Sequence, residues 1–313
     1  MEQVNICILG AGGQLGSKLL NKFSQNENIK IFAVDKVFNN ELVEKKIEYL
    51  NIDLKKESLD LLLKLPNKEI KFINCIGIQH SFFSRKILDI NSKLNKKILN
   101  FLNNNFTDFH YIYISSLSVD NNISSEPIPG RGSPINYYGK SKLYHEKYLI
   151  ENIQKPNLTT IIRPAAFYDK KLSKNLEVFF DLLMNKVFVL PSKEMKRSFL
   201  SLDYFSELME KYILSNMNYE IFEVGDKKPI DFKYLFDYFE QNGIKTKSKI
   251  IYLPVFLFTL AGRVGYFIEH LGIHISLLTI LGEFGYNFVS KHKDFNLKLI
   301  QEDTYENFVE IFN

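Results

Sequence analysis

The stretch that most constrains this chain is "LGAGGQLG", residues 9–16, which directly follows the apolar run "VNICIL". It places glycines at Gly10, Gly13 and Gly16, with Gly12 as an additional one between them. Glycines let the backbone turn tightly and approach a pyrophosphate, and a helix that starts there offers free N–H groups. Glycine-rich turns are common, so the loop alone does not separate a phosphate-binding cradle from an ordinary turn.

The first half of the chain alternates between apolar runs and stretches with helical periodicity. The apolar runs are "VNICILG", "IKIFAVD", "KFINCIG", "FHYIYISS" and "LTTIIRP". The helix-patterned stretches are "LGSKLLNKFSQ", "SLDLLLKL", "NSKLNKKILNFLNNN" and "GKSKLYHEKYLIEN". Strands that alternate with helices indicate βαβ units, and right-handed crossovers then build a doubly wound parallel sheet in an α/β fold.

After "IIRP" this rhythm changes to helices such as "NLEVFFDLLMNK" mixed with short strands such as "FVLPS", "RSFLSL" and "YEIFEVG". We therefore predict a dinucleotide-binding domain over residues 1–165. A smaller mixed α/β lobe for the substrate is predicted over residues 166–313, some of whose strands and helices can return to the first domain. The apolar stretch 250–268 is expected to be a packed helix, because Pro254 and Arg263 leave it too short for a membrane span. Peripheral membrane contact is the alternative.

The composition is that of a soluble globular protein without a surface for nucleic acid. The 313 residues are 45% apolar and 24% charged, and the net charge of +4 is spread without a dense basic block. Cys7 and Cys75 both lie in apolar runs, which favours buried free thiols in a reducing compartment, and we expect a cytoplasmic location. His270 and His274 are four residues apart, but no third ligand accompanies them, so no metal site is expected.

The surroundings of the glycine loop favour a dinucleotide cradle. A strand precedes the loop, an amphipathic helix follows it, and the second strand ends at Asp35, about twenty residues after Gly16. A carboxylate there reaches the adenosine ribose and repels a 2′-phosphate, which favours NAD, although Lys36 softens this preference and leaves NADP possible. Asp53, in "NIDL", is expected at a strand end, where it can accept a hydrogen bond from adenine or cap the next helix.

The candidate chemistry lies in "ISSLSV" and "YYGKSK". Tyr138 and Lys142 are four residues apart at the start of a predicted helix, so they share one face. A nearby ammonium favours the phenolate, so Lys142 is expected to lower the pKa of Tyr138. The phenol can then exchange a proton with an alcohol or ketone oxygen while hydride moves to or from nicotinamide. Ser116, at a strand end, can hold the same oxygen.

These motifs together resemble the extended short-chain dehydrogenase/reductase superfamily, in its NAD-dependent epimerase/dehydratase family acting on nucleotide sugars. The glycine loop, "NIDL", "FINCIG", "LDINSKLNKKIL", "ISSLSV", "YGKSK" and "IIRP" run in family order over about the first half of the chain. The resemblance implies a Rossmann fold, Tyr138 as the acid/base, Lys142 as its partner and ribose contact, and Ser116 as the second ligand of the oxygen. It also implies a homodimer formed through the helices around "NSKLNKKILNFL" and "GKSKLYHEKYL".

The resemblance further implies a set of residues that contact the cofactor. One member of this set, Asn91, would also support the active site from its helix. This set comprises Gly10, Gly13, Gln14, Leu15, Gly16, Asp35, Lys36, Asp53, Leu54, Cys75, Ile76, Gly77, Asn91, Tyr138, Lys142 and Pro164. The nucleotide-sugar substrate would contact Ser116 and Arg197. The second serine of the motif, Ser116, matches the catalytic position of the family, and its neighbour Ser115 is the residue that could be confused with it. Arg197 lies in "RSFLSLDYF", which is similar to the family segment whose arginine binds the substrate diphosphate.

Departures from the family pattern narrow the expected activity. The serine stretch continues as Val119-Asp120 instead of Val-Tyr-Gly, and Ala165-Ala166 follows "RP" where many epimerases carry an asparagine. The Thr-Asp-Glu pattern of sugar 4,6-dehydratases is missing, which argues against a dehydratase. We expect a 4-keto reductase or dehydrogenase acting on C4 of a nucleotide sugar in surface polysaccharide synthesis. A 4-epimerase with tightly bound NAD is the alternative, and a non-catalytic dinucleotide sensor is a remote one.

Overall fold

A parallel sheet of seven strands forms the centre of the computed structural model, which describes residues 3–38, 46–79, 81–120, 126–169, 187–215, 218, 220–244, 249–291 and 302–312. The strand order is β11-β6-β5-β4-β1-β2-β3, and it reverses between β1 and β4, which confirms the doubly wound α/β fold. The strands are β1 (Val4–Leu9), β2 (Ile29–Asp35), β3 (Ile47–Asn51), β4 (Ile70–Asn74), β5 (Phe109–Ile114), β6 (Leu158–Pro164) and β11 (Ile221–Val224).

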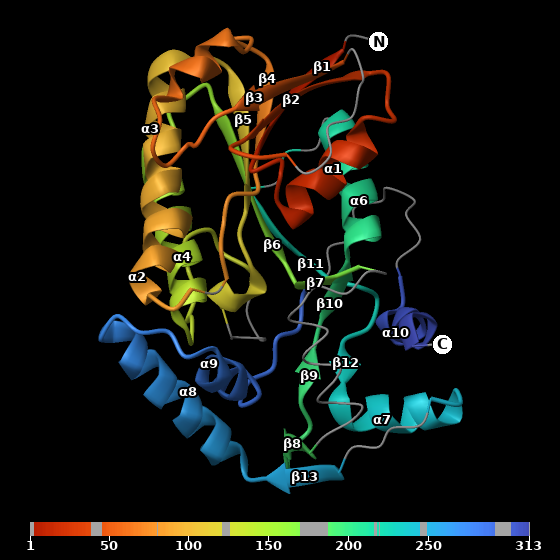
Figure 1. Ribbon diagram of the computed structural model, residues 1–313. Coiled ribbons are helices and arrows are strands. Elements are labelled where there is room, and N and C mark those ends of the chain that lie inside the picture. The colour runs from red at the N-terminus through yellow and green to blue at the C-terminus, as the bar shows by residue number, and fades with distance from the viewer. Residues whose placement is uncertain are drawn as a thin grey trace.

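Helices cover both faces of this sheet (Figure 1). On one face lie α1 (Gln14–Phe23) and α6 (Leu202–Leu214), and on the other lie α3 (Asn95–Asn105) and α4 (Tyr137–Asn152). Because both faces are covered, the strands are continuous apolar runs, and every residue of β5 is buried.

The core is therefore divided by the sheet into two layers. Leu19 and Phe205 belong to the layer under α1 and α6, whereas Phe72 and Leu99 belong to the layer under α3. Each of these side chains is fully buried, and burial of such a side chain contributes about 1.5–3 kcal/mol.

Two of the helices predicted from periodicity differ in the structure. The stretch "SLDLLLKL" forms only a short 3-10 helix, η1 (Leu59–Lys64), because it lies between a capping Ser58 and Pro66, which cannot continue a helix. The stretch predicted as one helix from residue 91 is preceded by α2 (Ser84–Leu88) and begins with a π-helical segment, η2 (Asp89–Leu94), before α3. A further 3-10 turn, η3 (Leu117–Val119), follows β5.

Among the described residues, the second part of the chain adds three small two-stranded sheets and four helices besides α6. The strand pairs are β7 (Ala166–Tyr168) with β10 (Phe199–Ser201), β9 (Lys196–Arg197) with β12 (Ile230–Asp231), and β8 (Val187–Pro191) with β13 (Lys249–Leu253). The helices are α7 (Phe232–Gln241), α8 (Val255–His270), α9 (Ser276–Glu283) and α10 (Thr304–Phe312). From this part, α6 and β11 return to the main sheet. The helix predicted in "NLEVFFDLLMNK" lies outside the described residues.

The apolar stretch 250–268 was expected to be helical throughout, and this prediction is wrong at its first residues. β13 runs to Leu253, and α8 begins only at Val255. Pro254 separates them because it has no N–H for the ladder, while its fixed φ suits the position before a helix. Within the described residues, no helix is long and apolar enough to cross a membrane.

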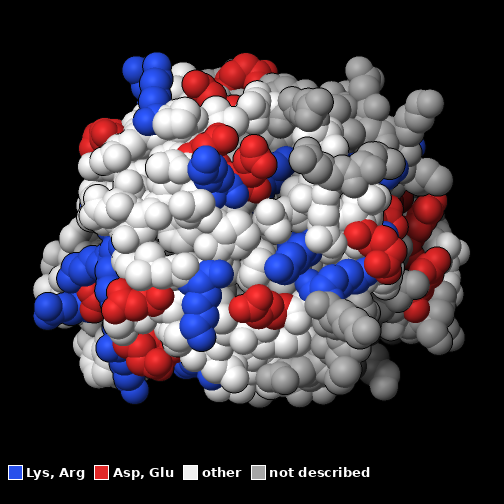
Figure 2. Space-filling view, turned by 90° about the horizontal axis from the view of Figure 1, so that it is seen from above, with Lys and Arg blue, Asp and Glu red and all other residues white. Residues whose placement is uncertain are grey.

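One face of the molecule, seen from above in Figure 2, carries positive and negative side chains interspersed without a single-sign field. This distribution agrees with the absence of a dense basic block in the sequence. Both cysteines are free thiols; Cys7 is buried, whereas Cys75 is half-buried.

Candidate active site

The glycine loop between β1 and α1 is shaped by contacts that exclude side chains. Gly10 has a φ of +83°, in the left-handed region that glycine tolerates. A Cβ on Gly16 would lie 2.1 Å from the carbonyl oxygen of Gly10, so the helix can pack on the loop only with glycine there. Gly12 is not merely an additional glycine, because its Cβ would lie 2.1 Å from the carbonyl oxygen of Val37.

The first turn of α1 presents backbone N–H groups to a cavity. Gly13 is the N-cap residue, and no side chain caps the helix. The cavity has a volume of about 440 Å³, and residues 13–16 line it. Uncapped N–H groups at a helix start, with the positive end of the helix dipole behind them, are suited to a pyrophosphate. The residues present thus fit the phosphates of a dinucleotide.

Most residues expected to bind the cofactor or the substrate line this one cavity. They come from the loops at the carboxyl ends of β1, β4, β5 and β6 and from α1, α4 and β9. The residues in this group are Gly13, Gln14, Leu15, Gly16, Cys75, Gly77, Ser116, Tyr138, Lys142, Pro164 and Arg197. The other expected residues are not among those that line the cavity: Gly10, Asp35, Lys36, Asp53, Leu54, Ile76 and Asn91.

Asp35 lies at the end of β2 and fixes the glycine loop from outside the cavity. Its Oδ2 accepts a hydrogen bond from the N–H of Gly12 at 3.0 Å, and its Oδ1 accepts one from the N–H of Lys36 at 2.7 Å. Asp53 accepts a hydrogen bond from the N–H of Lys55 at 3.1 Å in a local turn, and the prediction that it caps the next helix is wrong, because η1 begins six residues later and Ser58 caps it. Both carboxylates stand at strand ends on the side of the sheet where the sequence predicted them.

Asn91 is a positioning residue in the π-helical segment η2. Its side chain is fully buried; its Oδ1 accepts from the N–H of Ile78 at 2.8 Å, and its Nδ2 donates to the Ile78 carbonyl at 2.8 Å. The same Nδ2 donates to the Ser141 hydroxyl on α4 at 3.0 Å. Asn91 therefore ties the loop after β4 to the helix that carries Tyr138 and Lys142.

Ser116 and Tyr138 meet at the cavity wall. Both side chains line it, and the Ser116 Oγ donates to the Ser118 Oγ at 3.2 Å and accepts from the N–H of Ser118 at 3.1 Å, which holds it at the start of η3. Burial raises the pKa of Tyr138 to about 12, an effect that the nearby Ser116 hydroxyl opposes and the charge of Glu283 reinforces.

Lys142 is buried below Tyr138, and the expected lowering of the tyrosine pKa is wrong for this structure. The Lys142 Nζ donates to the carbonyl of Ile114 at 2.9 Å and lies 6.0 Å from the centre of the Tyr138 ring. The ammonium is therefore directed at a backbone oxygen, and burial determines the pKa of the phenol. Burial also lowers the pKa of Lys142, to about 8.

The two neighbouring serines have different surroundings. The Ser115 hydroxyl donates to Glu146 Oε1 within the core, and Glu146 forms a buried ion pair with Arg163, in which Nη2 and Oε2 are 2.7 Å apart. Arg163 belongs to the "IIRP" motif, so the motif pins β6 to α4. The Ser115 hydroxyl is thereby held within the core, whereas the Ser116 hydroxyl is the one close enough to influence Tyr138 at the cavity.

The sequence reasoning missed the contribution of the C-terminal helices to the cavity. Glu283, at the end of α9, accepts from Asn136 Nδ2 at 2.9 Å and from Arg197 Nη2 at 3.1 Å. The same segment brings His274 and Thr279 to the lining. The sequence signal that could have indicated this contribution is Glu283, the single carboxylate in the otherwise apolar stretch "SLLTILGE".

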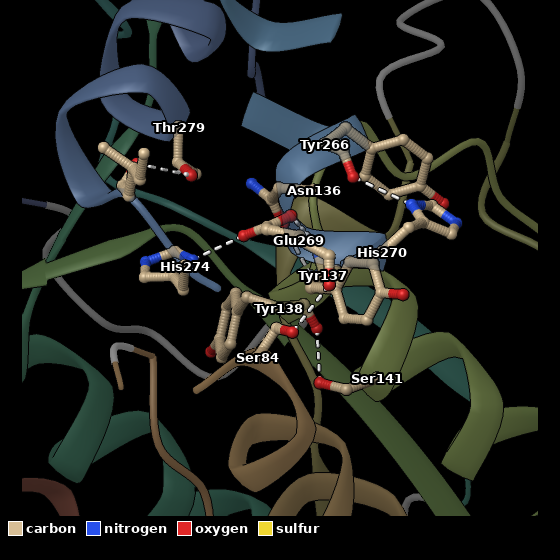
Figure 3. A network of polar contacts seen from close by, with 12 residues as sticks. Ser84, Asn136, Tyr137, Tyr138, Ser141, Tyr266, Glu269, His270, His274 and Thr279 are labelled. Carbon is tan, nitrogen blue, oxygen red and sulfur yellow. Dashed lines mark hydrogen bonds and ion pairs between the residues drawn. The ribbon is translucent and has the colours of Figure 1, made fainter. Parts of the chain in front are cut away.

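Glu269 anchors this segment to the start of α4 (Figure 3). Its carboxylate accepts from the N–H of Tyr137 at 3.0 Å and pairs with the ring of His274. His270 instead packs its ring against Tyr137 and Tyr266. In the part of the chain that the structure describes, no three His, Cys, Asp or Glu side chains group as metal ligands.

Comparison with known families identifies the family of this chain. The sequence model of the NAD-dependent epimerase/dehydratase family matches residues 6–200, which include the glycine loop, Ser116, Tyr138 and Lys142. The chain belongs to this family. The resemblance seen in the motifs is thereby confirmed, and the family is one of NAD-dependent enzymes. Among curated proteins, no sequence matches significantly.

Solved structures with similar folds include three that are named as epimerases of nucleotide sugars. A UDP-N-acetylglucosamine 4-epimerase from Methanobrevibacter ruminantium, solved with UDP-N-acetylmuramic acid, is 14% identical, with 100% of this chain and 96% of that chain covered and a TM-score of 0.68. The UDP-glucuronic acid 4-epimerase from Bacillus cereus with NAD is 17% identical, with 79% and 87% covered and a TM-score of 0.65. The ADP-L-glycero-D-manno-heptose-6-epimerase from Helicobacter pylori is 20% identical, with 81% and 86% covered and a TM-score of 0.61.

Proposed function

We propose that this protein is an NAD-dependent oxidoreductase that acts on C4 of a nucleotide sugar. The observation that carries the proposal is that the Ser116 and Tyr138 side chains line the same cavity as the uncapped start of α1. The pair can bind one carbonyl or alcohol oxygen, while the helix start receives the phosphates of the cofactor. When bound, the nicotinamide of NAD supplies the site that donates or accepts hydride.

The protein's own residues manage the proton on the substrate oxygen. Because the pKa of Tyr138 is raised to about 12, its phenol is protonated at neutral pH, which is the form that donates a proton to a carbonyl oxygen during reduction. Ser116 donates a second hydrogen bond to that oxygen as negative charge develops on it. Lys142 stays at the base of the cavity, and we assign to it the contact with the nicotinamide ribose.

Asp35 supports the assignment of NAD over NADP. Its carboxylate is fixed at the end of β2 by the N–H groups of Gly12 and Lys36, so its negative charge stands beside the glycine loop. A 2′-phosphate near this carboxylate would be repelled. Lys36, on the surface next to Asp35, offsets part of that repulsion.

Arg197 is the residue that we assign to the substrate diphosphate. It lines the cavity from β9, and its Nε is buried without a hydrogen-bond partner among the described residues. An unpaired buried donor of this kind is costly unless a ligand supplies an acceptor. A diphosphate bound there would satisfy the Nε, which supports a nucleotide sugar as the substrate class.

The direction proposed first is the reduction of a 4-keto sugar, because a protonated Tyr138 suits proton donation. We assign such a reductase to the synthesis of sugars for surface polysaccharides. The second candidate is 4-epimerisation, which is favoured by the similar structures named as epimerases of UDP-glucuronic acid and UDP-N-acetylglucosamine. An epimerase would need Tyr138 to accept a proton first and to return it later.

One assay separates the two directions. Purified protein is incubated with NADH and a panel of 4-keto nucleotide sugars, and separately with UDP-N-acetylhexosamines. Consumption of one NADH for each 4-keto sugar that is reduced indicates the reductase. Exchange between C4 epimers without net change in NADH indicates the epimerase. If neither reaction occurs with any nucleotide sugar in the panel, the proposed function is wrong.

We also propose a homodimer through α3 and α4 and a cytoplasmic location. The two helices lie together on one face of the sheet, where Tyr148 donates to Asn100 at 2.6 Å and Asn103 donates to the carbonyl of Asn152 at 2.7 Å. A second copy added to this pair would form a four-helix contact. Sedimentation velocity of the purified protein distinguishes such a dimer from a monomer, and the free thiols agree with a reducing compartment.

A further inference from the structure

Helix α8 is apolar on the face that it buries and on the face that it exposes. Its inner side meets α9, where Gly262 packs closely against Gly282 and where Phe258 is buried. Its outer side presents Phe256 and Phe267, whose exposed fractions are 63% and 65%. A surface helix of a globular protein normally carries polar residues on the outer side, so the outer side of α8 is a surface that lacks its partner.

The same surface continues beyond α8 into the neighbouring loops. The loop before α2 is joined to the segment after α8, because the N–H of His274 donates to the Phe82 carbonyl at 2.8 Å and the N–H of Ser84 donates to the Gly272 carbonyl at 3.2 Å. Exposed apolar side chains thus form one group at this end of the molecule. We call this group the apolar face, and it consists of Phe82, Phe83, Phe256, Leu260, Val264, Phe267, Leu271 and Leu277.

The fully exposed charges beside the apolar face are basic. Arg85 and Lys86 are exposed next to Phe83, and Arg263 is exposed on α8 itself. The described residues of 81–89 and 249–283 contain three carboxylates: Glu269 and Glu283 are turned inward into the contacts described above, and the half-buried Asp89 is paired with Lys93 at 2.8 Å. This differs from the face in Figure 2, where both signs are interspersed.

We propose that the apolar face docks on the surface of an anionic lipid bilayer, with α8 lying in the interface. Exposed aromatic and aliphatic side chains with mainly basic residues around them complement acyl chains beneath negative headgroups. The described helices cannot span a bilayer, so the contact is peripheral. A second copy fits this surface less well, since a two-fold contact would bring one positively charged rim against another.

Docking in this way would place the bilayer beside the active site. The helix α9, which packs on α8, carries Thr279 and Glu283 into the cavity. The inference does not depend on which reaction occurs there, because it rests on exposure and charge alone.

The test is sedimentation of the purified full chain with lipid vesicles. We expect the protein to bind vesicles of phosphatidylcholine with phosphatidylglycerol and to bind vesicles of phosphatidylcholine alone more weakly. Phe256→Ser with Phe267→Ser removes two inserted side chains and should weaken binding by at least about tenfold. Arg263→Gln should weaken binding to the anionic vesicles by about fivefold and leave binding to the neutral vesicles unchanged.

A matched control is Leu63→Ser with Leu158→Ser, which removes two exposed apolar side chains on other elements. The control should bind vesicles as the wild type does, and the thermal midpoint of each variant shows that it is folded. The inference is wrong if the wild type does not bind anionic vesicles, or if the α8 variant and the control lose binding equally. It is also wrong if the wild type is a dimer that dissociates in the α8 variant, since a second copy would then cover the face.

Discussion

Arg197 and Glu283 form an ion pair across the cavity, with 3.1 Å between Nη2 and Oε2. The pair joins β9 to α9, and the remaining carboxylate oxygen of Glu283 accepts from Asn136 at the start of α4. A diphosphate that binds Arg197 must therefore compete with a carboxylate that is already in place. On the proposed role of Arg197, we therefore expect Glu283 to influence the affinity for the substrate.

Glu283→Gln should increase the affinity for UDP by up to about fivefold, because the amide retains the bond from Asn136 but no longer neutralises Arg197. Arg197→Met should decrease the affinity instead. Isothermal titration with UDP measures both. If neither variant changes the dissociation constant, Arg197 does not contact the diphosphate.

Ser115→Ala and Ser116→Ala should separate a structural hydroxyl from a catalytic one. Ser115→Ala removes the bond to Glu146 and Ser116→Ala removes the two bonds with Ser118, so each should lower the free energy of unfolding by about 1–2 kcal/mol. Only Ser116→Ala should also lower turnover, by roughly a hundredfold. Urea unfolding and initial rates measure the two effects, and an equal loss of turnover in both variants would contradict the assignment.

Gly12→Ala and Gly16→Ala should each destabilise the glycine loop by about 2–3 kcal/mol, because the new methyl group meets a carbonyl oxygen at 2.1 Å. Gly13→Ala is the control, since its nearest such contact is 3.3 Å and its φ is −75°. Thermal unfolding measures the loss of stability, and titration with NADH measures whether the glycine loop still binds the cofactor. A loss in Gly13→Ala as large as in the other two would show that sterics do not shape the loop.

His145 should make the protein sensitive to acid. Burial lowers the pKa of His145 from its ordinary value of 6.5 to about 3, and neither ring nitrogen has a hydrogen-bond partner among the described residues. Between these pH values the unfolded chain binds more protons than the folded one, so stability is present above pH 6.5 and is lost as pH falls.

The loss from His145 amounts to about 1.4 kcal/mol per pH unit. His110, with a pKa lowered to about 4, adds to it. His145→Phe should make the fall in unfolding free energy from pH 6.5 to pH 4 clearly shallower, whereas Tyr144→Phe, on the same helix, should not. Identical slopes in all three proteins would contradict the account.

The sheet could be predicted because each of its signals is local. An apolar strand, a glycine loop and an amphipathic helix follow one another within about 25 residues. The alternation of strand and helix then continues along the first half of the chain and predicts the doubly wound sheet. Tyr138 and Lys142 could be placed on one face because helical spacing is fixed. The requirement for glycine at residue 12 was missed because it depends on Val37, which lies 25 residues away.

The wall formed by the C-terminal helices could not be predicted, since it depends on tertiary packing. Glu269 and Glu283 enter the site through contacts with residues about 130–150 positions earlier, for which periodicity gives no signal. The pKa of Tyr138 was misjudged for a related reason. Four residues of spacing bring Lys142 near the ring, but the rotamer that directs its ammonium to Ile114 is set by the surrounding core.

The most direct test of the central claim compares Tyr138→Phe with Tyr137→Phe, using the nucleotide sugar that the NADH assay identifies. Tyr137 is the adjacent residue; its ring packs against Tyr266 and His270, and it is not part of the cavity lining. Turnover should fall by roughly a thousandfold in Tyr138→Phe with NADH affinity retained, and it should remain near the wild-type rate in Tyr137→Phe. Wild-type turnover in Tyr138→Phe would contradict the account.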